Sequence, residues 1–269
     1  MSDGLRLIQQ GYAHAAEGWA TGAERAYAPM AAALLAASPV ALDGRRLLDV
    51  GAGTGAVSRL ARAAGARPVA FDASFEMLAH QAAARPPATV ADILRLPVRS
   101  GAADGAAAAF VLNHLAHPVA ALRELARVVA PGGFVLASVF SATDRPAAKA
   151  AIDGALASAG WEPPDWYRFV KGVDGQLGSV TAMRQAAEDA GLVDVVVTDQ
   201  PVDTGIREPA AIVEFRLSQP HVAPFLRAQP DEARARVVRE CVEAVAATGQ
   251  GLAPGVVILA ASTPGSPRR

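Results

Sequence analysis

The stretch LLDVGAGTGA, residues 47–56, joins a short apolar run to three glycines at alternating positions. Glycine tolerates positive φ and lets a ligand approach the backbone, so Gly51, Gly53 and Gly55 predict a tight turn after a strand. The helix expected after this turn, from Val57, would direct its free N–H groups toward the same place. The stretch therefore predicts a nucleotide-like ligand at the end of the first strand.

The same letters also fit the dinucleotide pattern G-x-G-x-x-G/A through Gly51, Gly53 and Ala56. The carboxylate of Asp49 argues against that interpretation, because it would repel a pyrophosphate and attract a ligand with ammonium and sulfonium groups. Gly55 is a third glycine that the dinucleotide pattern does not use. A nicotinamide oxidoreductase, and a glycine-rich turn without a ligand, remain as alternatives.

Composition limits the classes of function. The 269 residues suffice for one large α/β domain, and the formal net charge of −1 argues against nucleic acid or an anionic membrane as the main partner. The single cysteine, Cys241, excludes an intramolecular disulfide and a cysteine metal cage. No apolar stretch is long enough to span a bilayer. We expect a cytoplasmic protein, monomeric or homodimeric, that uses no metal ion.

Short apolar runs alternate with segments of helical period, which is typical of βα units and a parallel sheet. Strands are expected at 46–50, 68–71, 89–91, 106–112, 133–140, 193–198 and 255–261. One helix is expected at 74–84 with Ser74 as its N-cap. The predicted fold is α/β, a doubly wound, mostly parallel, seven-stranded Rossmann-like sheet.

A second helix is expected at 118–129, followed by a stop at Pro131-Gly132-Gly133. Its apolar face is predicted to contain Val119, Leu122, Ala126 and Val129. Residues 1–262 are expected to form a single domain with its cofactor-binding core at 45–140. A helical N-terminal cap at 1–40 and cap insertions at 141–180 and 205–248 complete the expected layout, with the longest helix at 231–247. Residues 263–269 are expected to be a disordered tail.

Five motifs between Arg46 and Ser138 resemble, in order and spacing, the core of the class I S-adenosylmethionine-dependent methyltransferases. They are LDVGAGTG (48–55), FDASFEML (71–78), ADILRLP (91–97), VLNHL (111–115) and ALRELARVVAPGG (121–133). Within that family the sequence is most similar to the small-molecule enzymes of ubiquinone and menaquinone biosynthesis. The resemblance covers about a third of the chain well.

The resemblance implies S-adenosyl-L-methionine as cofactor and assigns its contacts. The implied cofactor-binding residues are Asp49, Gly51, Gly53, Gly55, Asp72, Ala73, Met77, Asp92, Ile93 and Asn113. Asp49 and the glycine turn would hold the methionine half, and Asp72 would accept the ribose hydroxyls. Asp92 would accept from the adenine amino group, with the Ile93 N–H beside the ring. Two alternatives stay open, because Met77 could be plain core and Asp92 could only cap a turn.

His114 is the implied catalytic residue, since the resemblance places it near the transferring methyl group. A histidine with an ordinary pKa near ~6.5 can deprotonate a hydroxyl, enol or amine. The alternative is that His114 only shapes the wall of the pocket. His14 and His221 lie in the cap segments, where they could reach a substrate, although nothing in their spacing indicates it.

Half of the 14 aromatic residues lie in the N-terminal segment and the segment after the fifth strand. Such rings suit an apolar pocket that orients one functional group, although a small satellite core is the alternative. The substrate-binding candidates are Tyr12, Trp19, Trp166, Tyr167 and Phe169. We predict methyl transfer to O, C or N of a small, largely apolar molecule in bacterial secondary or cofactor metabolism. The alternative is a non-methylating S-adenosylmethionine-binding cyclase of the same fold.

Overall fold

The computed structural model describes residues 11–12, 18–80, 82–173 and 176–265, which form a seven-stranded sheet and its surrounding helices. Across the sheet the strands are β3 (Ala88–Val90), β2 (Arg67–Asp72), β1 (Arg46–Val50), β4 (Ala103–Ala109), β5 (Val129–Phe140), β7 (Gly255–Ser262) and β6 (Val193–Pro201). Strands β1 to β5 pair in parallel, whereas β7 runs antiparallel to both β5 and β6. The predicted doubly wound, mostly parallel, seven-stranded sheet is confirmed.

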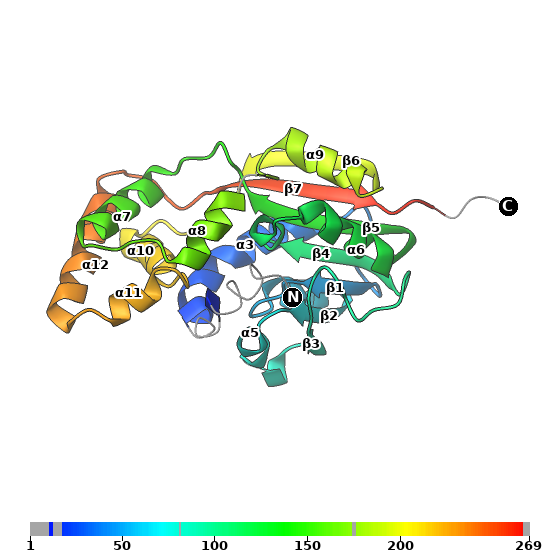
Figure 1. Ribbon diagram of the computed structural model, residues 1–269, viewed down its shortest axis with the longest axis horizontal. Helices are drawn as coiled ribbons and strands as arrows, with labels where there is room; N and C mark the ends of the chain where they lie inside the picture. Colours follow the sequence, from blue (N-terminus) through cyan, green and yellow to red (C-terminus); the bar gives the residue numbers. More distant parts are fainter. Residues whose placement is uncertain (1–10, 13–17, 81, 174–175, 266–269) are drawn as a thin grey trace.

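Helices flank the sheet and also form a group at one end of the molecule (Figure 1). The flanking helices are α3 (Glu24–Ala36), α4 (Ala56–Ala63), α5 (Phe75–Ala79), α6 (Pro118–Val128) and α9 (Val180–Asp189). The end group, here called the cap, contains α7 (Ala147–Ser158), α8 (Asp165–Val173), α10 (Pro209–Leu217), α11 (Ala223–Arg227) and α12 (Asp231–Ala246). Short turns of helix are η1 (Trp19–Ala23), η2 (Ala82–Ala84) and η3 (Leu112–His114). None of the helices in the described ranges combines the length and apolarity needed to cross a membrane.

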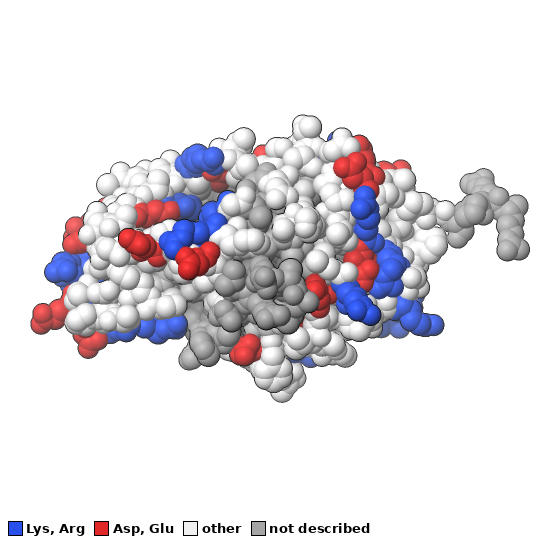
Figure 2. Space-filling view, viewed as in Figure 1, with Lys and Arg blue, Asp and Glu red and all other residues white. Residues whose placement is uncertain are grey.

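Adjacent residues of the central strands point to opposite faces, which produces two apolar cores. Leu47 of β1 and Leu136 of β5 belong to a core shared with α3, α4 and the cap. Their neighbours Leu48 and Val135 belong to a core shared with α6 and α9. Burial on both faces explains why these parallel strands are continuous apolar runs. On the face seen in Figure 2, acidic and basic side chains are interspersed.

The prediction of a strand at 106–112 is wrong at both ends. β4 begins at Ala103, because its ladder to β5 continues through Gly105 and Ala103. It ends at Ala109, since Phe110 has φ 54°, a left-handed conformation that bulky residues rarely adopt. The Phe110 ring packs on Phe140 with ring centres 4.6 Å apart. This packing holds the turn from which η3 follows.

Two helix predictions need correction at their ends. The helix expected at 74–84 ends at Ala79, and η2 is a separate turn. Its predicted N-cap is confirmed, because the Ser74 hydroxyl accepts a hydrogen bond from the Met77 N–H at 3.2 Å. Helix α6 ends at Val128, and the segment Pro131-Gly132-Gly133 lies within β5 instead of ending the helix.

The buried face of α6 also differs from the expected one. Its buried residues are Pro118, Ala121, Leu122, Leu125 and Val128. Of the predicted set only Leu122 is buried within the helix, whereas Val119 and Ala126 are half-buried and Val129 already belongs to β5. The buried positions are spaced i, i+3, i+4, i+7 and i+10, so they form one helical face that is rotated from the predicted one toward the sheet and α9.

Three further predictions concern the C-terminal tail, the longest cap helix and the N-terminal helices. The disordered tail was expected from Thr263, but that residue is buried and its hydroxyl donates to the Ala130 carbonyl at 2.6 Å. The longest cap helix, expected at 231–247, is α12. Within 1–40 the described helices are η1 and α3, while His14 lies outside the described residues.

Candidate active site

A cavity of about 730 Å³ lies between the carboxyl ends of the central strands and the cap. Open α/β sheets bind ligands where the strand order reverses, which here is between β1 and β4. Most of the predicted site residues line this cavity: Tyr12, Trp19, Asp49, Gly51, Gly53, Asp72, Ala73, Met77, Ile93, Asn113, His114, Trp166 and Tyr167. Gly55, Asp92 and Phe169 do not line it.

Asp49 is a buried carboxylate whose two oxygens have different surroundings. Oδ2 accepts hydrogen bonds from the Ser58 N–H at 2.9 Å and the Ser58 hydroxyl at 2.6 Å. Oδ1 is buried without a hydrogen-bond partner among the described residues. Burial raises the pKa of Asp49 to about 6, and the bonds from Ser58 oppose that rise. A buried oxygen of this kind suits a cationic group of a ligand.

The glycine turn has no room for side chains. Gly51 and Gly53 have φ of 74° and 53°, and a Cβ on Gly51 would lie 2.6 Å from the Val111 side chain. Gly55, with φ 96°, is the N-cap of α4, and a Cβ there would lie 2.9 Å from the Arg85 guanidinium. Gly51 and Gly53 therefore line the cavity, whereas Gly55 lies on the side of the turn that faces Arg85.

Asp72 fixes the turn from the neighbouring strand. Its Oδ2 accepts the Gly53 N–H and its Oδ1 accepts the Ser74 N–H, both at 2.8 Å. Burial raises the pKa of Asp72, and these two backbone donors oppose the rise. The Ala73 N–H also donates to this carboxylate, so three backbone donors occupy three of its roughly four acceptor positions and leave one for a ligand hydroxyl.

Sequence reasoning missed Arg85, which supports the turn from outside the cavity. Its guanidinium donates to the Gly53 carbonyl at 2.8 Å and the Met77 carbonyl at 3.0 Å. Its charge also opposes the rise that burial causes in the pKa values of Asp49 and Asp72. No motif marks this arginine in the sequence, because its contacts form only when the loop after η2 folds back on the turn.

A second support that the sequence did not indicate comes from the N-terminal helix α3. The Thr54 hydroxyl donates to Glu24 at 2.5 Å, and Arg59 forms an ion pair with the same carboxylate. Arg59 also donates to the Thr54 carbonyl at 2.9 Å. The N-terminal segment is therefore bonded directly to the glycine turn.

The structure places Asp92 in the turn-capping role. Its Oδ1 accepts the Leu94 N–H at 2.9 Å, and its neighbours Ala91 and Ile93 line the cavity in its place. Met77 fits both of its interpretations, because it is buried and also lines the cavity. A contact of Asp92 with a ligand base stays a prediction.

Asn113 and His114 reach the cavity from η3, directly after the turn at Phe110. Asn113 Oδ1 is buried without a hydrogen-bond partner among the described residues. His114 Nε2 lies 3.5 Å from the Tyr12 hydroxyl. Burial raises the pKa of Tyr12 well above its usual value, so its hydroxyl stays protonated at neutral pH.

Aromatic rings continue from His114 into the cap. The Tyr12 ring centre lies 6.0 Å from that of His114, 5.8 Å from Trp166 and 5.9 Å from Trp19. Trp166 is in turn 5.8 Å from Tyr167. These rings form one wall, whereas the remaining candidate, Phe169, lies on the same helix without lining the cavity.

Charged residues at the far end of the cavity were missed by sequence reasoning. Asp153 of α7 and Arg216 of α10 form an ion pair at 2.7 Å. His221, which had no assigned role, lies beside them with its Nε2 2.5 Å from Arg216 Nη1. The two charged residues are 63 positions apart, so no local spacing could have indicated the pair.

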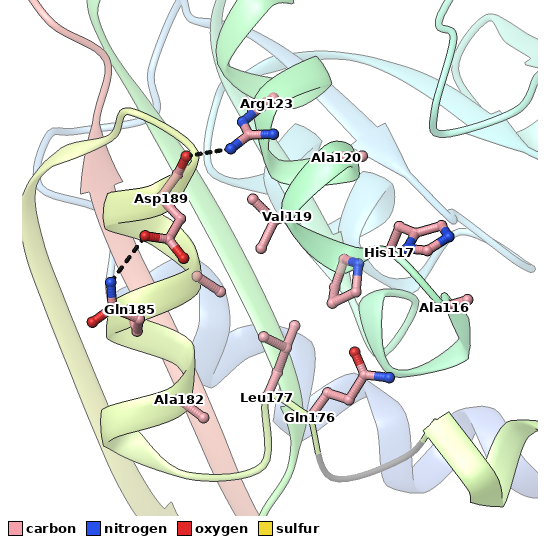
Figure 3. A pocket seen from close by; sticks show the side chains of 12 residues that line it. Ala116, His117, Val119, Ala120, Arg123, Gln176, Leu177, Ala182, Gln185 and Asp189 are labelled. Carbon is pink, nitrogen blue, oxygen red and sulfur yellow. Dashed lines mark hydrogen bonds between the residues drawn. The ribbon is translucent and has the colours of Figure 1, made fainter.

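A second, open hollow lies between α6 and α9 and shares no lining residue with the cavity (Figure 3). Arg123 donates to the Asp189 carbonyl at 2.8 Å, and Gln185 donates to the Asp189 carboxylate at 2.9 Å. The Arg123 bond joins α6 to α9, whereas the Gln185 bond lies within α9. Within the described ranges, no three His, Cys, Asp or Glu side chains are grouped to hold a metal ion.

Comparison with known proteins identifies the domain. Residues 48–137 match the family described as "Methyltransferase domain". The demethylmenaquinone methyltransferase of Mycobacterium tuberculosis (strain ATCC 25177 / H37Ra) is 41% identical over 98 residues, which cover 36% of this chain and 42% of that protein. The chain thus spans about two fifths of the length of the curated relatives it matches.

Two solved structures share the fold across most of the chain. Phosphoethanolamine N-methyltransferase 2 of Haemonchus contortus, in complex with phosphomonomethylethanolamine and S-adenosylhomocysteine, has TM-score 0.55 and 18% identity, covering 87% of this chain and 52% of that one. A methyltransferase from Thermotoga maritima has TM-score 0.57 and 13% identity, covering 97% and 99%. The matched segment, with its glycine turn and strand order, is therefore a methyltransferase domain similar to that of the demethylmenaquinone methyltransferases, and the chain has the fold of the S-adenosylmethionine-dependent methyltransferases.

Proposed function

We propose that this chain transfers a methyl group from S-adenosylmethionine to an O, C or N atom of a small molecule. The observation that carries the proposal is one continuous cavity that reaches from the glycine turn to the aromatic wall of the cap. A donor at one end and an acceptor at the other would share that space. The cyclase alternative is not favoured, because the matched domain and the curated relatives are methyltransferases.

The cavity residues fit the proposed cofactor at both of its ends. S-adenosylmethionine would supply a methyl group on a positively charged sulfur. Asp49 Oδ1 and Asn113 Oδ1 are buried acceptors without hydrogen-bond partners among the described residues, and both residues line the cavity. Asp72 offers acceptor capacity to a ribose hydroxyl, and the walls at Met77 and Ile93 are apolar enough for an adenine ring.

The residues of this chain would accelerate the reaction mainly by alignment. Holding two reactants in line contributes up to ~7–11 kcal/mol, and the transfer needs little acid catalysis. Tyr12 and Trp166 would keep water away from the reacting atoms, because their rings form the wall beside His114. His114 would accept a proton from the acceptor or position it.

The test is transfer of labelled methyl from S-adenosylmethionine to a panel of small phenols, amines and enols, with S-adenosylhomocysteine measured in parallel. Gly53→Val should abolish transfer, because a branched side chain at φ 53° fills the cavity beside Met77. Gly44→Val is the matched control, since Gly44 has φ 69° but open space around it. Product formation without S-adenosylhomocysteine would contradict methyl transfer.

A further inference from the structure

His221 lines the cavity from the loop between α10 and α11, and only 7% of the residue is exposed. Three contacts hold it in place. The Trp161 indole N–H donates to the His221 carbonyl at 3.0 Å. The imidazole ring stacks on the Tyr167 ring with ring centres 3.7 Å apart and planes at 3°, and its Nε2 lies 2.5 Å from Arg216 Nη1. These contacts fix both the position and the orientation of the ring.

Arg216 determines which nitrogen of His221 carries the proton. A guanidinium has donors and no acceptor, so Nε2 accepts from Arg216 and the proton of the ring lies on Nδ1. Burial and the charge of Arg216 lower the pKa of His221 to about 2, which keeps the ring neutral. The remaining nitrogens of Arg216, Nε and Nη2, donate to Asp153 Oδ1 at 2.9 and 2.7 Å. The charge of Arg216 is therefore paired within the protein.

The Nδ1–H group of His221 is a donor that the protein leaves unused. Among the described residues the ring forms one hydrogen bond, and that bond is at Nε2. Nδ1 does not belong to the polar atoms that are both unpaired and fully shielded, so it keeps accessible surface. Because His221 lines the cavity, this surface is open to a ligand. An unpaired donor in a buried residue costs free energy, which a ligand oxygen at that position would recover.

His114 and His221 line the same cavity and are separated by aromatic rings. They are near enough for their charges to interact, because His114 is one of the groups that lower the pKa of His221. The rings lead from His114 through Tyr12 and Trp166 to His221, in steps of 6.0, 5.8 and 6.2 Å between centres. A molecule with its reacting atom beside His114 and an apolar body along these rings would bring its other end to His221.

We propose that the methyl acceptor carries a neutral carbonyl oxygen at the end opposite its methylated atom, and that this oxygen accepts a hydrogen bond from His221 Nδ1–H. The inference rests on the proposed function, because it assigns a substrate class to that reaction. A neutral N–H suits a neutral oxygen, since it supplies a hydrogen bond without the opposite charge that a buried carboxylate would need. A site that hydrogen-bonds one substrate oxygen discriminates strongly against the analogue that lacks it. His221 is then a residue that determines specificity.

The test is calorimetric titration of the full chain, saturated with S-adenosylhomocysteine, with phenols that differ only in a carbonyl group. The pairs are para-hydroxyacetophenone with para-ethylphenol, and para-hydroxypropiophenone with para-propylphenol. We expect the ketone of at least one pair to bind about tenfold more tightly than its alkyl counterpart.

Two substitutions of nearly equal shape separate the donor from the contact with Arg216. His221→Gln should keep the preference for the ketone, because its amide can accept from Arg216 and still donate to a ligand. His221→Glu can accept from Arg216 but has no N–H, so the preference should be lost. His117→Glu is the matched control, since His117 is exposed and lies outside this cavity. All three variants should bind S-adenosylhomocysteine like the wild-type chain.

The outcomes separate this proposal from the proposed function. Equal affinity of ketone and alkyl probes, a preference that survives in His221→Glu, or no binding of any probe overturns the role of His221. A second measurement is independent of the probes: proton–nitrogen NMR of the histidine rings at neutral pH should show His221 neutral and protonated on Nδ1, and a proton on Nε2 would also overturn the proposal. Failure of the wild-type chain to bind S-adenosylhomocysteine instead contradicts the proposed function.

Discussion

A single oxygen of Asp49 accepts both hydrogen bonds that Ser58 offers, from its backbone N–H at 2.9 Å and its hydroxyl at 2.6 Å. Asp49 is a buried residue of β1, one position before its end, and Ser58 lies in the first turn of α4, so the pair joins the two elements that flank the glycine turn. The other Asp49 oxygen remains for a ligand. One carboxylate thus stabilises the turn and lines the cavity beside it.

The hydroxyl of Ser58 should contribute measurably to stability. Ser58 is fully buried, and a hydrogen bond to a charged group contributes about 1.5–3 kcal/mol. Ser58→Ala should therefore lower the free energy of unfolding by about 2 kcal/mol in urea denaturation. Ser158→Ala, at an exposed position of α7, should change it by less than about 0.5 kcal/mol. Equal effects of the two substitutions would show that the bond to Asp49 is not important for stability.

The charge of Asp49 should govern the pH dependence of cofactor binding. Because its pKa is raised to about 6, the carboxylate becomes protonated as the pH falls through 6 and its attraction for a cationic ligand is lost. The Kd for S-adenosylmethionine should rise below pH 6 in the wild-type chain. Asp49→Asn should weaken binding about tenfold at pH 7.5, equivalent to about 1.4 kcal/mol, and give a flat profile from pH 5 to 8. Parallel profiles for the two proteins would assign the titration to another group.

His114 should affect the rate more than cofactor binding. If it removes a proton from the acceptor, His114→Ala should lower kcat by about 10²–10⁴-fold, with partial recovery at high pH, while the Kd for S-adenosylhomocysteine is unchanged. Tyr12→Phe keeps the ring wall and removes the hydroxyl near His114 Nε2, so a smaller effect is expected. An unchanged kcat in His114→Ala would make His114 a wall residue and leave alignment as the source of catalysis.

The neutral state of His221 should make the cap sensitive to acid. Its pKa falls from an ordinary 6.5 to about 2 on folding, so below pH 6.5 the unfolded chain binds a proton that the folded chain does not. Stability should therefore decrease as the pH falls through 6.5. Comparison of Tm at pH 7.5 and 5.5 should show a smaller loss in His221→Gln, whose amide oxygen can still accept from Arg216. An equal loss in both proteins would exclude His221 as the group responsible.

The part of the cavity beside the glycine turn could be predicted from the sequence, because its interactions are local. The glycine turn, Asp49 and the strand that contains them lie within one short segment, and Asp72 follows at the end of the next strand. The central strands β1, β4 and β5 could be placed because buried parallel strands are apolar runs between helices. The left-handed Phe110, which ends β4 early, has no sequence signal, since its conformation depends on packing against Phe140.

The part of the cavity beside the cap could not be predicted from the sequence, because its contacts join segments that are far apart in the chain. Arg216 and Asp153 come from different cap helices, and the row of rings needs Tyr12 and Trp166 from opposite halves of the chain. The aromatic content of these segments correctly indicated four of the five residues proposed to line a pocket, although not Phe169. No pattern in the sequence indicates the cluster of Asp153, Arg216 and His221.

The central claim is that the turn at Gly51–Gly55 holds S-adenosylmethionine and not a dinucleotide, and one calorimetric titration tests it directly. The full chain is titrated at pH 7.5 with S-adenosylhomocysteine and, in a parallel experiment, with NAD. We expect saturable binding of S-adenosylhomocysteine at a single site and no binding of NAD, because the carboxylate of Asp49 lines the cavity and would repel a pyrophosphate. Saturable binding of NAD without binding of S-adenosylhomocysteine would contradict it.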